Sequence, residues 1–254
     1  MQPVLGRMAD VLGRVGLAAP AFRLFQRLQS LAPSHADPAL PPAFLRILTT
    51  GAVNPIAYVE VGERAAREFV SLAEQNGRPL TPKTKVLDFG CGCGRVARAL
   101  QALAPVELHG CDVNARLIAW CVAHLKGTFQ RTRSKPPLPY PERAFDLVYA
   151  LSVFTHLTER RAVTWLQELA RVTRPGGLAI LSFLDAPDSQ RAAGGLQADG
   201  FAIKRSGPEG SNLLTVYYTP EGFAERAVPS WRMLGDVPSE RSAQGQALIV
   251  LERV

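Results

Sequence analysis

A glycine-rich segment, Val86-Leu-Asp-Phe-Gly-Cys-Gly-Cys-Gly-Arg95, constrains the fold of this chain more than any other part of the sequence. An apolar pair runs into Asp88, three glycines follow at alternate positions, and a helix-forming run begins at Arg95. Glycine permits a positive φ and leaves no Cβ to obstruct a ligand that lies against the backbone. The first turn of a helix also presents unpaired amide donors. The segment therefore predicts a strand, a tight loop and a helix that together hold a ligand.

The spacing of the glycines distinguishes between ligands. The dinucleotide fingerprint G-x-G-x-x-G requires a glycine where this chain has Arg95. Instead, a carboxylate precedes the first glycine by two residues, which suits a ligand with a positive ammonium group and would repel a pyrophosphate. This pattern resembles the first motif of class I S-adenosylmethionine-dependent methyltransferases. The resemblance implies that Asp88 serves the ammonium of the methionyl moiety, directly or by way of water and backbone, and that the cofactor lies against Gly90, Cys91, Gly92 and Gly94.

A second segment supports this resemblance. Val106-Glu-Leu-His-Gly-Cys-Asp112 reads as a strand that ends in an acid. The resemblance implies that Asp112 accepts hydrogen bonds from the ribose hydroxyls, as the corresponding acid does in dinucleotide folds, and that Val113 contacts the cofactor. In the family, a polar and often acidic residue after the third strand binds the adenine amine. This chain has no acid there, so the candidates are Thr132, the next two residues or a backbone group.

Two later segments complete the order of motifs. Ala144-Phe-Asp-Leu-Val-Tyr-Ala-Leu-Ser-Val-Phe-Thr-His156 resembles the fourth strand of the family, whose C-terminal end faces the transferred methyl group. Leu169-Ala-Arg-Val-Thr-Arg-Pro-Gly-Gly-Leu-Ala-Ile-Leu-Ser-Phe183 resembles the helix, Pro-Gly-Gly turn and fifth strand that follow. The resemblance places three residues at the methyl end of the cofactor: Ala150, Leu151 and Ser152.

The sequence predicts that strands and helices alternate through the middle of the chain. Near its end it predicts two further strands, 231–236 and 246–251, which form a closing hairpin. Such alternation implies a parallel sheet with a ligand at the C-terminal ends of its strands. We expect a doubly wound, mostly parallel seven-stranded α/β fold of the methyltransferase type. Residues 1–50 are expected to form a helical N-terminal extension, and 51–254 the S-adenosylmethionine-binding domain. Leu184 to Ser211 reads as irregular, so we expect a substrate lid within 184–215.

Composition narrows the class of protein. With 254 residues, 47% of them hydrophobic, the chain is long enough to bury a full sheet between helix layers. The net charge of +7 comes from scattered residues without a long Lys/Arg run, so nucleic acid is not favoured as a partner. The cysteines predict no disulfide framework and no metal site, and a reducing, cytoplasmic location fits them best. No apolar run approaches the roughly 18 residues of a transmembrane helix.

The first 31 residues have two interpretations. Apolar residues recur at helical spacing. The segment contains four arginines but only one acidic residue, Asp10. Such a basic amphipathic segment lies on a membrane surface or docks a partner in some proteins. The alternative is that these helices pack on the domain or cover the substrate pocket, which is common in the resembled family. Tyr58, in a segment that borders the cofactor in many small-molecule methyltransferases, is either a cofactor contact or a buried packing residue.

The resemblance leaves the methyl acceptor open. Amino-group methylation of bases commonly goes with an Asn/Asp-Pro-Pro-Tyr/Phe motif at the end of the fourth strand, where this chain has Tyr149-Ala-Leu-Ser-Val. We therefore favour a small-molecule acceptor, methylated on oxygen or alternatively on nitrogen. An RNA or protein methyltransferase that uses the basic surface is a second hypothesis. A third is a catalytically silent module that binds a partner or membrane through its N-terminal helices.

His156 is the candidate catalytic residue. It follows the fourth strand, near the expected acceptor, and an unperturbed histidine pKa near 6.5 suits a general base. In the family, however, a histidine in a segment like Val-Phe-Thr-His-Leu often has a structural or cofactor-side role. Both interpretations remain open at the level of sequence.

Overall fold

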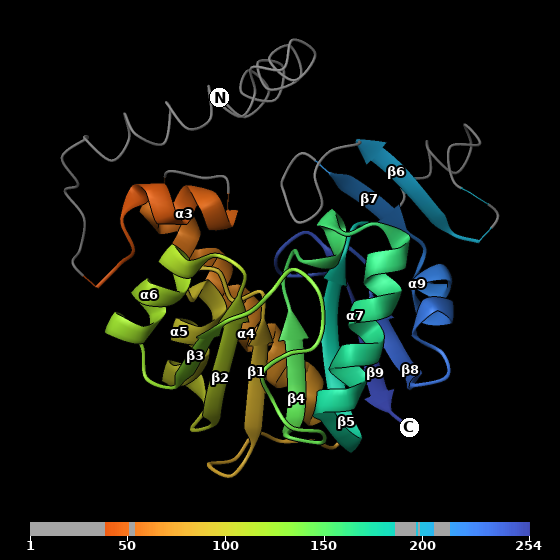
Figure 1. Cartoon of the computed structure of the whole chain (residues 1–254), viewed down its shortest axis with the longest axis horizontal. Helices are drawn as coiled ribbons and strands as arrows, with labels where there is room; N and C mark the ends of the chain where they lie inside the picture. The colour runs from red at the N-terminus through yellow and green to blue at the C-terminus, as the bar shows by residue number, and fades with distance from the viewer. Residues whose placement is uncertain (1–38, 51–53, 186–196, 198, 206–213) are drawn as a thin grey trace. The chain divides into compact units, whose positions relative to one another are not determined.

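The computed structural model of the protein describes residues 39–50, 54–185, 197, 199–205 and 214–254 (Figure 1). The chain divides into two units, residues 1–58 and 59–254. The first unit contains α3 (Ala43–Thr50), and α4 (Pro55–Gln75) begins in it. The predicted helices of residues 1–31 lie outside the described residues, and the predicted domain boundary at residue 50 stays a prediction. Among the helices of the described ranges, none combines the length and apolar character needed to cross a membrane.

The second unit is built on a seven-stranded sheet with the strand order β3-β2-β1-β4-β5-β9-β8. The neighbours from β3 to β5 pair in parallel, and β9 pairs antiparallel with β5 and β8. This confirms the predicted fold class and the closing hairpin. The strands are β1 (Lys85–Phe89), β2 (Glu107–Asp112), β3 (Thr128–Arg131), β4 (Phe145–Ala150), β5 (Thr173–Phe183), β8 (Trp231–Val237) and β9 (Ala247–Arg253).

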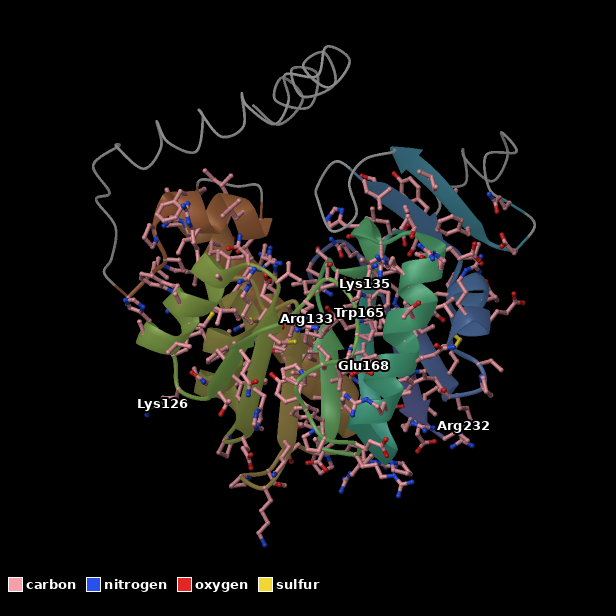
Figure 2. The ribbon with its side chains drawn as sticks, viewed as in Figure 1. Lys126, Arg133, Lys135, Trp165, Glu168 and Arg232 are labelled. Atoms are coloured by element: carbon pink, nitrogen blue, oxygen red, sulfur yellow. The ribbon has the colours of Figure 1, made fainter. Side chains whose placement is uncertain are left out.

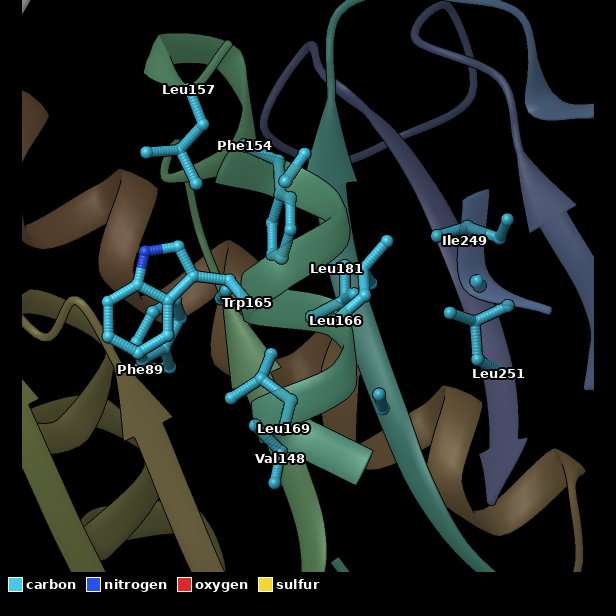
Figure 3. Close-up of a cluster of buried hydrophobic side chains, with 14 of the residues drawn as sticks. Phe89, Val148, Phe154, Leu157, Trp165, Leu166, Leu169, Leu181, Ile249 and Leu251 are labelled. Atoms are coloured by element: carbon cyan, nitrogen blue, oxygen red, sulfur yellow. The ribbon is translucent and has the colours of Figure 1, made fainter. Parts of the chain in front are cut away.

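Helices cover both faces of the sheet because successive strand residues point to opposite sides. On one face, residues such as Leu87, Val148 and Leu181 form a core with α7, and Figure 3 shows this cluster around Trp165. On the other face, Val86 and its counterparts in β4, β5 and β9 pack against α4, α5 and α6. The helices that follow α4 are α5 (Arg95–Leu103), α6 (Ala115–His124), α7 (Glu159–Val172) and α9 (Pro220–Ala227), with a 3₁₀ turn η1 (Phe154–His156).

The order of the strands places a topological switch point at the C-terminal ends of β1 and β4. From β1 the chain proceeds to β2 and β3 on one side, then returns to β4 on the other side of β1. The connections after β1 and β4 therefore leave the sheet in opposite directions. In open α/β sheets ligands bind at such a switch point, so the topology places the glycine-rich loop at the expected site.

Two sequence expectations were wrong in detail. Residues 184–211 were expected to be irregular, yet β6 (Phe201–Arg205) lies there and pairs antiparallel with β7 (Thr215–Tyr218) in a second, two-stranded sheet. The expected Pro-Gly-Gly turn lies inside β5, which begins directly after α7. A left-handed Gly176 and a register shift opposite Phe145 absorb the irregularity within the strand. The predicted lid stays a prediction, because residues 186–196, 198 and 206–213 lie outside the described ranges.

Arg226 ties the small sheet to the main one. Its guanidinium bonds to Glu159 at the start of α7 at 2.6 Å and to Asp199 before β6 at 2.7 Å. It also lies over the rings of Phe201 and Tyr218, at 5.5 and 5.7 Å from their centroids. Because the Arg226 side chain is buried, losing either carboxylate would leave a poorly compensated charge.

We predict that Gly62→Ala destabilises the domain. Gly62 lies in α4, and a Cβ there would overlap the backbone carbonyl oxygen of Arg95 at the start of α5. Alanine is the better helix former, which offsets part of the cost, so we expect the free energy of unfolding to fall by about 1–2 kcal/mol. Urea denaturation measures this change. Gly235→Ala is the matched control because its Cβ would enter open space, and equal stability of the two variants would contradict the prediction.

Candidate cofactor and methyl-transfer site

The glycine-rich loop has the conformation that its composition predicts. Gly90, Gly92 and Gly94 have φ angles of 75°, 57° and 79°, in the left-handed region that favours glycine. The amides of Gly90 and Cys91 both donate to the carbonyl oxygen of Cys111, at 2.8 and 3.0 Å. Gly94 is the N-cap of α5. The loop is therefore fixed to the end of β2 while it delivers the chain into α5.

Close packing leaves no room for a Cβ at two of the three glycines. A Cβ on Gly90 would overlap the side chain of Val153, which follows β4, and a Cβ on Gly94 would overlap Leu125 after α6. Cys91 and Cys93, between the glycines, are buried, and contact of Cys91 with the cofactor stays a prediction. At Gly90 and Gly94, glycine is thus required both by the backbone and by the neighbours of the loop.

Asp112 ends β2 and contacts the glycine loop directly. One carboxylate oxygen accepts the Gly92 amide at 3.0 Å, and the other accepts the Asn114 amide at 2.7 Å. Burial raises the pKa of Asp112 above its ordinary value, although these amide donors oppose the shift. The acid predicted to hold the ribose therefore lies beside the loop predicted to hold the rest of the cofactor. Val113, the next residue, is exposed.

The side chain of Asp88 lies in a more enclosed environment than that of Asp112. The residue is only 3% exposed, and Oδ2 accepts a hydrogen bond of 3.0 Å from the hydroxyl of Tyr149. Burial raises the pKa of Asp88 to about 7, against the opposing effects of the Tyr149 hydroxyl and the Arg95 guanidinium. Sequence reasoning missed this role of Tyr149. The signal available was a hydroxyl in the apolar run Leu147-Val-Tyr-Ala150, and the parallel register, which places Tyr149 opposite Asp88, is visible only in the structure.

The predicted methyl end lies at the C-terminus of β4. Ala150 and Leu151 are buried, while Ser152 has a φ of 62°, unusual for a residue with a side chain. Its amide donates to the Ser182 hydroxyl at 2.7 Å, and its own hydroxyl accepts from Gln246 Nε2 at 2.5 Å. The Ser182 hydroxyl donates in turn to Gln246 Oε1 at 2.8 Å. This closed network, which the sequence did not reveal, holds Ser152 in its strained conformation.

His156 is the last residue of η1, which follows Ser152 along the chain. Its Nδ1 is 2.7 Å from the carbonyl oxygen of Leu214. Because a carbonyl only accepts, Nδ1 carries the proton and Nε2 keeps its lone pair in the neutral ring. Burial lowers the pKa of His156 below its ordinary value, so the ring is neutral at pH 7. A neutral, oriented imidazole has the properties of a general base.

The segment after β3 is anchored, but the atom that would bind adenine stays a prediction. Thr132 is buried, and its amide donates to the carbonyl oxygen of Asp112 at 2.9 Å. Further along, the Leu138 amide donates to the buried carboxylate of Glu168 in α7 at 2.7 Å. Arg171 pairs with the same carboxylate at 2.6 Å. Figure 2 labels Glu168 on α7 and Arg133 on this connecting segment.

The remaining candidate, Tyr58, is buried in α4. It belongs to the first unit, whose position relative to the second is not determined. Its proposed contact with the cofactor therefore stays a prediction.

Comparison with known proteins relates the sequence and the fold to methyltransferases. Residues 86–177 match the family model of a methyltransferase domain. The 27-O-demethylrifamycin SV methyltransferase of Amycolatopsis mediterranei is 32% identical over 136 residues, which cover 51% of this chain and 48% of that enzyme. A ubiquinone biosynthesis O-methyltransferase of Rhodopseudomonas palustris is 26% identical over 180 residues, which cover 66% of this chain and 65% of the enzyme. The chain thus spans about half to two thirds of these relatives.

Solved structures show the same fold. The glycopeptide N-methyltransferase MtfA, in complex with S-adenosylhomocysteine, has a TM-score of 0.56 at 15% identity, covering 76% of this chain and 90% of MtfA. The sheet order, the four motifs and the family match together define a class I S-adenosylmethionine-dependent methyltransferase fold. The fold is therefore that of this class, and residues 86–177 match its methyltransferase domain, in agreement with the motifs.

We predict that Asp112→Ala weakens binding of S-adenosylhomocysteine by roughly tenfold to a hundredfold, because hydrogen bonds to a charged acceptor contribute about 1.5–3 kcal/mol. Calorimetric titration measures the loss, and thermal unfolding checks that the domain stays folded. Glu107→Ala, at the exposed start of the same strand, serves as the control and should bind normally. Unchanged binding by the Asp112 variant would show that β2 does not contribute the ribose site.

Proposed function

We propose that the protein binds S-adenosylmethionine at the glycine loop and transfers its methyl group to a small-molecule acceptor, on oxygen. The observation that carries this proposal is the convergence of two strand-end carboxylates on one loop. Asp112 accepts the Gly92 amide at 3.0 Å, and Asp88 lies at the end of the adjacent strand. A ribose and an ammonium group on one ligand match this pair of acids. A pyrophosphate does not, because the Asp88 carboxylate beside the loop would repel it.

The names of the relatives support the choice of acceptor. The Amycolatopsis relative is named for methylation of a demethylrifamycin, and the Rhodopseudomonas relative is an O-methyltransferase of ubiquinone biosynthesis. Nitrogen is the alternative acceptor atom. An RNA or protein acceptor has less support, because the connection after β4 departs from the base-methylating motif and the basic residues are scattered. Contact of residues 1–31 with a membrane or partner belongs to the separate hypothesis of a silent module.

Methyl transfer requires the protein to align the methyl donor and the acceptor more than to activate the donor. When bound, the sulfonium of the cofactor supplies an activated methyl group for in-line displacement. The protein has to hold donor and acceptor in line and to exclude water. In this chain, the glycine loop and Asp112 would hold the adenosine part, while the Ser152 network would shape the surface against which the methyl group lies. An acceptor hydroxyl also has to lose its proton, and we assign this role to Nε2 of His156.

Direct titration tests the cofactor. We expect S-adenosylmethionine and S-adenosylhomocysteine to bind purified protein with micromolar dissociation constants, near −8 kcal/mol, and NAD not to bind. Isothermal calorimetry with the three ligands measures this difference. If folded protein binds neither adenosyl ligand, the silent-module hypothesis gains and the proposed reaction fails.

A screen of hydroxyl acceptors then tests His156. We expect His156→Gln to slow transfer to a hydroxyl acceptor by about 100-fold, the scale of general-base catalysis, without changing cofactor affinity. In the wild type the rate should fall as the pH drops through the lowered pKa of His156, because protonation removes the lone pair of Nε2. If the variant transfers the methyl group at the wild-type rate, His156 has only a structural role, through its hydrogen bond with the carbonyl oxygen of Leu214.

A further inference from the structure

Asp88 and Tyr149 form a buried, hydrogen-bonded pair. The methyl transfer proposed above assigns no role to this hydrogen bond. Tyr149 is fully buried, and its ring packs against Phe69 of α4 with centroids 5.1 Å apart. Its hydroxyl donates to Asp88 Oδ2 at 3.0 Å. The Ala97 amide, in the first turn of α5, also donates to the Asp88 carboxylate. Donors from β4 and α5 therefore hold Asp88 in one orientation behind the glycine loop.

The charges around Asp88 leave its ionisation finely balanced. Burial favours the neutral acid, and the nearby Asp112 carboxylate acts in the same direction. The Tyr149 hydroxyl, the Arg95 guanidinium and the Ala97 amide favour the carboxylate. The Cys91 thiol is neutral, because its hydrogen bond with Cys121, burial and these carboxylates raise its pKa. Burial and the same carboxylates raise the pKa of the Cys111 thiol. The result is a pKa of about 7 for Asp88, so the free protein contains both forms near neutral pH.

A ligand with an ammonium group would shift this balance. Because Asp88 is 3% exposed, it offers little contact area, and its contribution to a ligand is mainly its charge. A cation placed at the adjacent loop stabilises the carboxylate and lowers its pKa. Below about pH 7, binding of the cation is then linked to loss of the proton from Asp88.

We propose that Tyr149 is a positioning residue that holds Asp88 as a carboxylate, and that this pair couples recognition of the cofactor's amino acid part to release of a proton. This inference rests on the proposed function. It adds a residue outside the glycine motif to the cofactor site, and it makes affinity depend on pH. Affinity for a ligand with the ammonium group rises as the pH approaches 7 and then levels off. Affinity for a ligand without that group does not follow this dependence.

Two adenosine thioethers separate these cases. S-adenosylhomocysteine carries the amino acid part, and 5′-methylthioadenosine lacks it. Both are titrated by calorimetry at pH 6.0 and pH 7.2, below the usual range of an α-amino pKa. If only the Asp88 carboxylate is competent, the affinity of S-adenosylhomocysteine should rise roughly fivefold between these values, while 5′-methylthioadenosine should change less than twofold. Any effect of Asp112, which serves the ribose of both ligands, cancels in the ratio.

Variants test the two members of the pair. Asp88→Asn should remove the pH dependence of the ratio between the two affinities. Tyr149→Phe removes only the hydroxyl, so at pH 7.2 it should weaken S-adenosylhomocysteine by about threefold or more and leave 5′-methylthioadenosine unchanged. Tyr140→Phe is the matched control. Its hydroxyl is also buried but donates to the Gly110 carbonyl oxygen at 3.3 Å, and it should bind both ligands as the wild type does.

The outcomes distinguish this inference from the proposed function. If neither ligand binds folded wild-type protein at either pH, the cofactor assignment fails. If both bind but the ratio of their affinities is independent of pH, the cofactor assignment stands and the coupling is overturned. Equal weakening of both ligands by Tyr149→Phe would show that Tyr149 only supports the fold. Should Tyr149→Phe fail to fold, the wild-type ratio and Asp88→Asn still decide the question.

Discussion

The hydrogen bond from the Gly92 amide to the Asp112 carboxylate is the interaction on which the site depends. It joins a loop that follows β1 to the last residue of β2, and two further amides of the same loop donate to the carbonyl oxygen of Cys111. A loop with three left-handed glycines would otherwise have high conformational entropy. These bonds to β2 hold it in one shape. The parallel pairing of β1 and β2 thereby fixes the conformation of the loop as well as the order of the sheet.

The rest of the sheet supports this arrangement from the other side. β4 lies next to β1, and Val153, in the connection that follows β4, packs on Gly90. The cluster around Trp165 holds α7 against β4 and β5, and Trp165 also packs on Phe89, with ring centroids 4.8 Å apart. The glycine loop is therefore enclosed by two strand ends and by cores on both faces. Rigid elements of this kind favour a preformed ligand site.

Much of the fold and part of the site could be predicted from local sequence. The glycine loop and the acids at the ends of β1 and β2 follow from short segments, since turn chemistry and hydrophobic runs are local properties. The strand β6 was missed because its partner β7 supplies the pairing, and no local signal marks it. Tyr149, Ser182 and Gln246 were missed for a similar reason. Their roles depend on register and on contacts between distant segments, which a single sequence does not display.

The network around Ser152 shows that the segment matched by the family model depends on residues outside that segment. The segment that matches the family model ends at residue 177, whereas the two side chains that hold Ser152 in its left-handed conformation come from Ser182 in β5 and from Gln246, directly before β9. The matched segment is therefore not self-contained in this protein. The conformation at the end of β4 depends on β5 and on the connection that leads into β9. Divergence in that C-terminal region would alter the surface around Ser152 while leaving every recognisable motif of the matched segment intact.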